Sequence, residues 1–147
     1  MPFVPKQCVV VPIDFSSSSA TAVHTALEFT SDPANVHVIH VIPSLNPVSP
    51  SGIWGDADVE KQLCTTAQRH LDTFIASLEV AGVTTAIEIG QAGNRIVEYA
   101  DEHSADLIVI PSHGHSGLKR AFLGSVAERV IRHARCATLV LRRDDGE

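Results

Sequence analysis

The sequence lacks the marks of several protein classes. No apolar run approaches the roughly 20 residues that a membrane-spanning helix needs, so we expect no membrane partner. Lys and Arg number 11 against 17 Asp and Glu, and no basic block occurs. We therefore expect no nucleic-acid partner, because proteins that bind nucleic acids need a basic surface. The N-terminus has one lysine before a short apolar run that Pro12 breaks, which makes a poor signal peptide.

Cysteines are scarce, and their spacing indicates no disulfide framework. Cys8, Cys64 and Cys136 form no CxxC motif, so we expect small buried apolar side chains in a reducing compartment. The reduced cysteines and the poor signal peptide together predict a cytoplasmic protein. The length of 147 residues, with 44% hydrophobic and 19% charged residues, predicts one globular domain over residues 1–147.

Common catalytic and cofactor motifs are also missing. There is no GxGxxG motif and no P-loop with its Gly-Lys-Ser/Thr end. Ser116 does not lie in GxSxG, so a serine hydrolase has no support. Among the eight histidines, His113 and His115 lack a HExxH or cysteine partner, and His37 and His40 should project to opposite faces of a strand. A metal-binding protein that uses histidines is a minor alternative.

What the sequence does contain is a regular alternation of strand and helix patterns. Apolar β-branched runs predict five strands, and amphipathic segments between them predict four helices. This alternation favours an α/β fold, a single doubly wound, Rossmann-like parallel sheet with helices on both faces. The partly polar third strand is a candidate edge strand, and the first should end at Pro12. The expected strands are Cys8–Ile13, Val36–Ile42, Val83–Ile89, Leu107–Ile110 and Ala137–Leu141.

Caps and breakers predict where the helices begin and end. Residues 16–19 are serines that offer N-caps for the first helix. Residues 43–55 hold three prolines and two glycines and are expected to form one long loop, a lid or a binding loop. Asp56 or Asp58 should cap the second helix, and Gly82 should end it. Its buried stripe is expected at Val59, Leu63, Ala67, Leu71, Phe74, Ile75 and Leu78.

The stretch Pro111–Ala134 has the parts of a backbone phosphate site. A strand leads into a glycine-bearing loop and then into a helix that starts near Ser125. Ser125 stands three residues before Glu128, the spacing of a capping box, so it is expected to be the N-cap. A phosphate at the same helix end would use the amides of Ser125 and Val126 and the serine hydroxyl. The two roles are compatible.

Asp14 follows the first strand directly. If the first and fourth strands are neighbours at the point where strand order reverses, Asp14 faces the 111–125 loop across a crevice. An acidic group there suits a ribose or base donor. Asp14 is equally typical of a helix cap or a turn, and no nucleophile accompanies it as it would a catalytic base.

The chain resembles the universal stress protein family from end to end. The resemblance rests on VVVPIDFS, HVI, ADLIVI and SHGHSGLKRAFLGSVAERVIRHA, followed by a final apolar strand. Nucleotide-binding members carry Gly-x2-Gly-x9-Gly-Ser/Thr, and Gly114, Gly124 and Ser125 fit its second half. Pro111 stands at the first glycine. If that position needs positive φ or an amide donor, proline weakens nucleotide binding, whereas at a simple strand end it is harmless.

The resemblance implies a strand order of 3-2-1-4-5 and a bound ATP or other adenine nucleotide, with Mg²⁺ or Mn²⁺ between its phosphates. It implies a homodimer through the fifth strand. The implied adenine and ribose contacts are Pro12, Asp14 and Val41. The implied phosphate contacts are Gly114, His115, Ser116, Gly117, Gly124, Ser125 and Val126.

The function expected from these features is that of a cytoplasmic, homodimeric stress-response regulator that binds ATP and acts on an unknown protein partner. Hydrolysis should be slow at best, because neither a base nor an arginine finger is apparent. One alternative is a dimeric scaffold of the same fold that binds no nucleotide, which Pro111 supports. Another is a nucleotide hydrolase or transferase on a related α/β fold.

Overall fold

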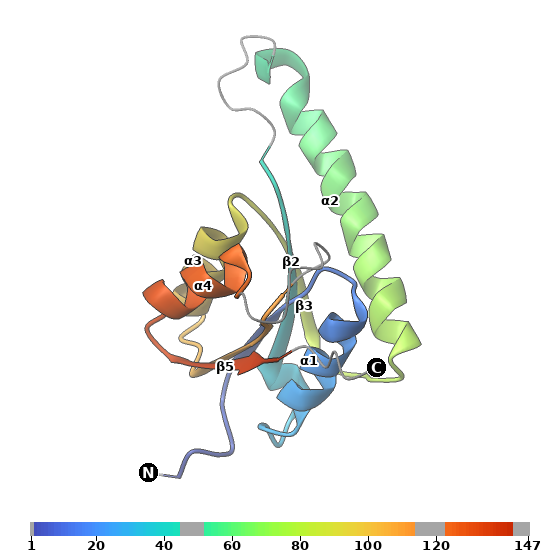
Figure 1. Ribbon diagram of the computed structural model, residues 1–147. Helices are drawn as coiled ribbons and strands as arrows, with labels where there is room; N and C mark the ends of the chain where they lie inside the picture. Colours follow the sequence, from blue (N-terminus) through green and yellow to red (C-terminus); the bar gives the residue numbers. More distant parts are fainter. Residues whose placement is uncertain (1, 45–51, 114–122, 143–147) are drawn as a thin grey trace.

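The strands and helices alternate along the chain as the sequence pattern predicts. The structure is a computed structural model that describes residues 2–44, 52–113 and 123–142, with the backbone alone over 52–57. Figure 1 shows the sheet in the middle of the molecule, between two layers of helices. The elements are β1 Val9–Pro12, α1 Ser17–Leu27, η1 Pro33–Asn35, β2 Val36–Ile42, α2 Gly52–Ser77, β3 Thr84–Ile89, α3 Ala92–Glu102, β4 Leu107–Pro111, α4 Ser125–His133 and β5 Ala137–Leu141.

The five strands form one sheet in the order β3-β2-β1-β4-β5, and every pair is parallel. This confirms the predicted fold class, the strand order and the edge position of β3. Strand order reverses between β1 and β4, which pair only at Val9 with Leu107 and at Val10 with Ile108. No further pair of described residues joins these two strands, so their carboxyl ends leave room for a crevice.

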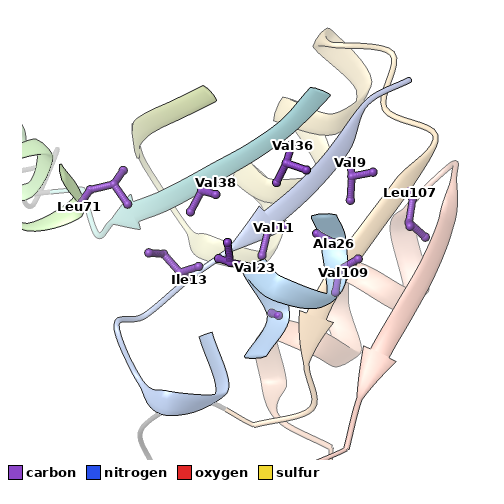
Figure 2. Close-up of a cluster of buried hydrophobic side chains, with 11 residues drawn as sticks. Val9, Val11, Ile13, Val23, Ala26, Val36, Val38, Leu71, Leu107 and Val109 are labelled. Atoms are coloured by element: carbon purple, nitrogen blue, oxygen red, sulfur yellow. The ribbon is translucent and has the colours of Figure 1, made fainter. Parts of the chain in front are cut away.

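Each face of the sheet has its own core. On the side of α1 and α2, alternate strand residues such as Val9, Val11 and Val109 point toward Val23 and Ala26 of α1 (Figure 2). The intervening residues pack with side chains of α3 and α4. These two helices lie on the other side of the sheet (Figure 1). Because both faces are covered, the strands are rich in Val and Ile, and each such side chain that is fully buried contributes about 1.5–3 kcal/mol.

The second helix departs from its predicted limits at both ends. It begins at Gly52, so the predicted loop is wrong over 52–55, while 45–51 lie outside the described residues. Glycine in a helix costs only about 1 kcal/mol, which a helix of this length tolerates. The helix ends at Ser77 and is followed by Glu79 in the left-handed region, with φ 57. Gly82, with φ 87, lies five residues beyond the helix and is not its stop.

The predicted apolar stripe of α2 is buried only in part. Leu71 is fully buried and Phe74 packs against the same core. Val59 and Leu63, nearer the start of the helix, remain 43% and 38% exposed. Figure 1 gives the reason, since this part of α2 extends beyond the end of the sheet. No described helix has the combined length and apolar character needed to cross a membrane.

The three cysteines are free thiols. Cys8 is buried as predicted, whereas Cys64 and Cys136 are only partly buried. Burial, followed by the nearby Asp106 and Cys136, raises the pKa of Cys8 to about 11. At neutral pH the Cys8 thiol is therefore protonated and acts as a small packing group.

Candidate functional site

A cavity of about 320 Å³ opens where β1 and β4 end. Its volume falls in the range of small-molecule sites, about 300–1,000 Å³. One wall comes from residues 12–14 at the end of β1 and from His40 and Val41 of β2. The other wall comes from residues 110–113 and the start of α4. The complete lining is Pro12, Ile13, Asp14, Ser19, His40, Val41, Ala92, Ile96, Ile110, Pro111, Ser112, His113, Gly124, Ser125, Val126 and Ala127.

The Asp14 carboxylate is held in one orientation by α1. Its Oδ1 accepts hydrogen bonds from the Ser16 backbone N–H at 3.1 Å and from the Ser19 hydroxyl at 2.8 Å. Ser19 Oγ in turn accepts the Asp14 N–H at 2.9 Å. The turn interpretation of Asp14 is confirmed, and Ser16 is the N-cap of α1. Because these bonds orient the side chain, a carboxylate is presented on the cavity wall without needing to reorganise.

His40 presents a fixed tautomer on the same wall. Its Nδ1 lies 2.9 Å from the Ile13 carbonyl oxygen, which only accepts, so Nδ1 carries a proton. In neutral His40, Nε2 is then a hydrogen-bond acceptor. The ring packs on Phe15 with centroids 4.6 Å apart, while His37 contacts Tyr99 of α3. The prediction that the two histidines lie on opposite faces of β2 is confirmed.

The start of α4 differs from the predicted capping box. The N-cap is Gly124, and Ser125 is the first helical residue. Gly124 N–H donates to the Ser112 carbonyl at 2.7 Å. This bond holds Gly124, whose backbone is extended, against the end of β4. The helix therefore starts one residue earlier than predicted. Glu128 N–H donates to the Gly124 carbonyl, and no side chain caps this helix end.

Gly124 is required by close packing rather than by its backbone angles. Its φ of −65° suits any residue. A Cβ at this position, however, would lie 2.9 Å from the Ser112 carbonyl oxygen and 3.5 Å from the His113 Cα. Any side chain would push α4 away from the end of β4, so this glycine keeps the helix N-terminus on the cavity wall.

Pro111 is the last residue of β4 and pairs with Leu141 of β5. It lines the cavity and is not among the positive-φ residues of the described chain. The next amide, Ser112 N–H, donates to the Leu141 carbonyl at 2.8 Å. The proline thus occupies an ordinary strand end, and the conformation seen here does not call for glycine.

His113 is buried and incompletely hydrogen-bonded. The side chain is 5% exposed, and its Nδ1 lies 3.0 Å from Ser112 Oγ. Within the described ranges, His113 Nε2 is the single buried side-chain nitrogen or oxygen without a hydrogen-bond partner. Leaving such a group unpaired costs about 1–3 kcal/mol. In the same part of the chain, no group of three or more metal-ligating side chains converges.

Six of the ten predicted site residues come together at this cavity. They are Pro12, Asp14, Val41, Gly124, Ser125 and Val126. The other four, Gly114, His115, Ser116 and Gly117, lie outside the described residues. Sequence reasoning missed Ser19, His40, Ser112 and His113, which also line the cavity. Three of them are adjacent in sequence to predicted site residues, since Ser112 and His113 directly precede Gly114 and His40 precedes Val41. Ser19 carried no such signal.

Comparison with known proteins gives a consistent result. A model of the universal stress protein family matches residues 7–142. Universal stress protein MJ0531 of Methanocaldococcus jannaschii is 34% identical over 95% of this chain and 84% of its own length. The solved structure of protein MJ0577 from that organism is 27% identical, with a TM-score of 0.74, and covers 97% of this chain and 99% of its own.

A more distant solved structure has the same fold. It is a universal stress protein of Archaeoglobus fulgidus in complex with dAMP, 23% identical with a TM-score of 0.59. The match covers 97% of this chain and 100% of the other chain.

Proposed function

Because this chain belongs to the universal stress protein family, we propose that it is a regulatory protein that binds ATP or another adenine nucleotide in the cavity between β1 and β4. The observation that carries this proposal is the pairing of two kinds of polar group across one cavity. A fixed acceptor, Asp14, lines one wall, and an uncapped helix N-terminus lines the other.

The helix end supplies the phosphate side. Ser125, Val126 and Ala127 begin α4 and line the cavity, and their amides belong to the first turn, where a helix has no internal acceptors. The aligned peptide dipoles add about half a positive charge at this end. Anionic oxygens of a phosphate satisfy both the amides and the dipole.

The other wall suits a nucleoside. The oriented carboxylate of Asp14 accepts from ribose hydroxyls, and neutral His40 offers Nε2 as an acceptor. Pro12, Val41 and Ile96 add apolar surface on which a base can pack. A solved structure with the same fold holds dAMP, which supports an adenine nucleotide as the ligand class.

A divalent cation would enter with the nucleotide. The described residues bring no three metal-ligating side chains together, so Mg²⁺ or Mn²⁺ would be held mainly by phosphate oxygens and water. In the proposed function the ion screens the phosphate charges. The described lining of the cavity holds no lysine or arginine side chain that could stabilise charge during phosphoryl transfer, so turnover of ATP should be slow.

We also propose that the protein acts as a homodimer through β5. This strand pairs with β4 on one side, and the sheet order makes it an edge. An unpaired parallel edge is a template for a second copy. Val126 and Ile131 of α4, 38% and 45% exposed, add apolar surface outside the core. Nucleotide binding at the start of α4 would then change the surface that this helix presents to an unknown protein partner. The proposed compartment is the cytoplasm, where the free cysteines stay reduced.

Isothermal titration calorimetry of the purified protein with Mg·ATP tests the nucleotide proposal. We expect saturable binding of one ATP per chain and a loss of affinity of about ten-fold or more in Asp14→Asn. Asparagine keeps an oxygen for the Ser16 N–H and removes the charge. Asp72→Asn on α2, whose carboxylate accepts from Gln68, is the matched control and should bind as wild type. Wild-type protein that takes up no ATP would refute the proposal.

A further inference from the structure

The one unpaired buried polar atom of the described residues belongs to the cavity. His113 lines the cavity wall and is 5% exposed, yet its Nε2 has no hydrogen-bond partner. Buried polar groups in folded proteins are nearly always paired, so such an exception needs a reason. A ligand in the cavity would provide one.

The His113 backbone is packed against the start of α4. Gly124 N–H donates to the carbonyl of the preceding residue, Ser112, at 2.7 Å. A Cβ on Gly124 would stand 3.5 Å from the His113 Cα. The imidazole thus comes from the segment that meets the helix N-terminus, the anion-attracting end of the cavity.

The hydrogen bond to Ser112 allows the His113 ring proton to reside on Nε2. Its Nδ1 lies 3.0 Å from Ser112 Oγ, and a hydroxyl both donates and accepts. When Ser112 donates to Nδ1, the ring proton resides on Nε2, which becomes a donor without an acceptor. A phosphate oxygen is the acceptor that matches such a donor beside a helix N-terminus.

We propose that His113 is a ligand-binding residue whose Nε2–H donates a hydrogen bond to a phosphate oxygen of the bound nucleotide. This inference rests on the proposed function and adds a side-chain donor to the backbone amides of α4. It assigns His113 to the phosphates and not to the base or ribose. No metal and no chemical step are involved.

Two substitutions at one position separate the two ring nitrogens. His113→Asn retains an amide near the position of Nδ1, so it can keep the Ser112 contact while removing the Nε2 donor. His113→Gln places its amide nitrogen near the position of Nε2. Calorimetry with Mg·ATP should show binding about ten- to hundred-fold weaker for His113→Asn and largely restored for His113→Gln.

A change of ligand tests the assignment to the phosphates. Adenosine should bind the wild type and His113→Asn with equal affinity, because it carries no phosphate. His37→Asn, on a half-buried histidine of β2 that does not line the cavity, is the control and should leave both affinities unchanged. Urea denaturation without ligand should show that His113→Asn still unfolds cooperatively, so that its weaker binding of ATP is not a loss of the fold.

Nitrogen-15 spectra of the histidine rings provide a signature that a purely structural role would not move. We expect His113 to be protonated at Nε2 in the free protein and its Nε2 resonance to shift on addition of Mg·ATP but not of adenosine. Equal ATP affinity in wild type and His113→Asn would overturn this inference alone. An equal loss with adenosine would do so as well. Wild-type protein that binds neither ligand would overturn the proposed function and this inference with it.

Discussion

Two polar clusters lie on the sheet of this protein, and their hydrogen bonding differs. One lines the cavity between β1 and β4; the other lies between β2 and α3. In the second cluster, His37 Nδ1 is 2.8 Å from the Tyr99 hydroxyl, and His103 Nδ1 donates to the Tyr99 carbonyl at 2.8 Å. The rings of Tyr99 and His103 stack with centroids 3.9 Å apart.

Charged groups beside the β2–α3 cluster are also paired within the chain. Arg95 of α3 contacts Glu88 of β3 at 2.8 Å, Glu98 at 3.2 Å and Glu102 at 3.1 Å. Burial, followed by nearby carboxylates, raises the pKa of Tyr99 to about 12, so its hydroxyl stays neutral and available for hydrogen bonding. Each of these groups has its partner in the fold.

The cavity is built in the opposite way. Asp14 is oriented by α1, α4 begins without a side-chain cap, and His113 Nε2 is buried without a partner. The comparison teaches that polarity alone does not mark a binding site. What marks this site is a helix N-terminus without a side-chain cap and a buried histidine nitrogen without a partner. Substitutions should therefore separate the two clusters, with binding effects at the cavity and stability effects at the β2–α3 cluster.

The largest expected effect is that of Gly124→Ala. Its Cβ would lie 2.9 Å from a backbone oxygen, so α4 must shift, and overpacking of this kind costs about 1–3 kcal/mol of unfolding free energy. ATP binding should be lost in calorimetry. Asp72→Asn on α2, a residue that does not line the cavity, is the control and should bind ATP as wild type. Wild-type affinity in Gly124→Ala would contradict the account of this wall.

A smaller effect is expected at the β2–α3 cluster. Tyr99→Phe removes the hydroxyl that contacts His37 and should lower the unfolding free energy by about 1–2 kcal/mol in urea denaturation. ATP affinity should not change. In a His37→Asn background, the same substitution should cost less, since the shared hydrogen bond is already altered. A loss of ATP affinity in Tyr99→Phe would remove the distinction between the two clusters.

The smallest expected effect is a pH dependence carried by His37. Burial, with His103 as a second cause, lowers the pKa of His37 from its usual 6.5. The unfolded chain therefore takes up this proton at a higher pH than the folded chain. The stability that neutral His37 contributes should be fully present above pH 6.5. It should fall as the pH drops below this value, because the unfolded state then binds more protons than the folded state. Thermal unfolding from pH 8 to about pH 5 should show a shallower decline in His37→Asn, and identical profiles would refute this assignment.

Much of the fold follows from local pattern. Alternating apolar residues in the five strands, the serines before α1 and the proline that ends β1 predict the elements and their order. The resemblance to a family supplied the strand order and six residues that line the cavity. Helix ends were harder, because the start of α2 at Gly52 and the cap at Gly124 depend on small free-energy differences that tertiary contacts override.

The sequence by itself determined the alternation of strands and helices, and hence a parallel sheet with helices on both faces, because side-chain periodicity is a local property. Only the tertiary structure decided which polar groups are paired. The partners come from distant segments, as with His37 and Tyr99, which are 62 positions apart. It is the approach of Gly124 to the Ser112 carbonyl that moves the cap from Ser125 and brings the start of α4 next to His113.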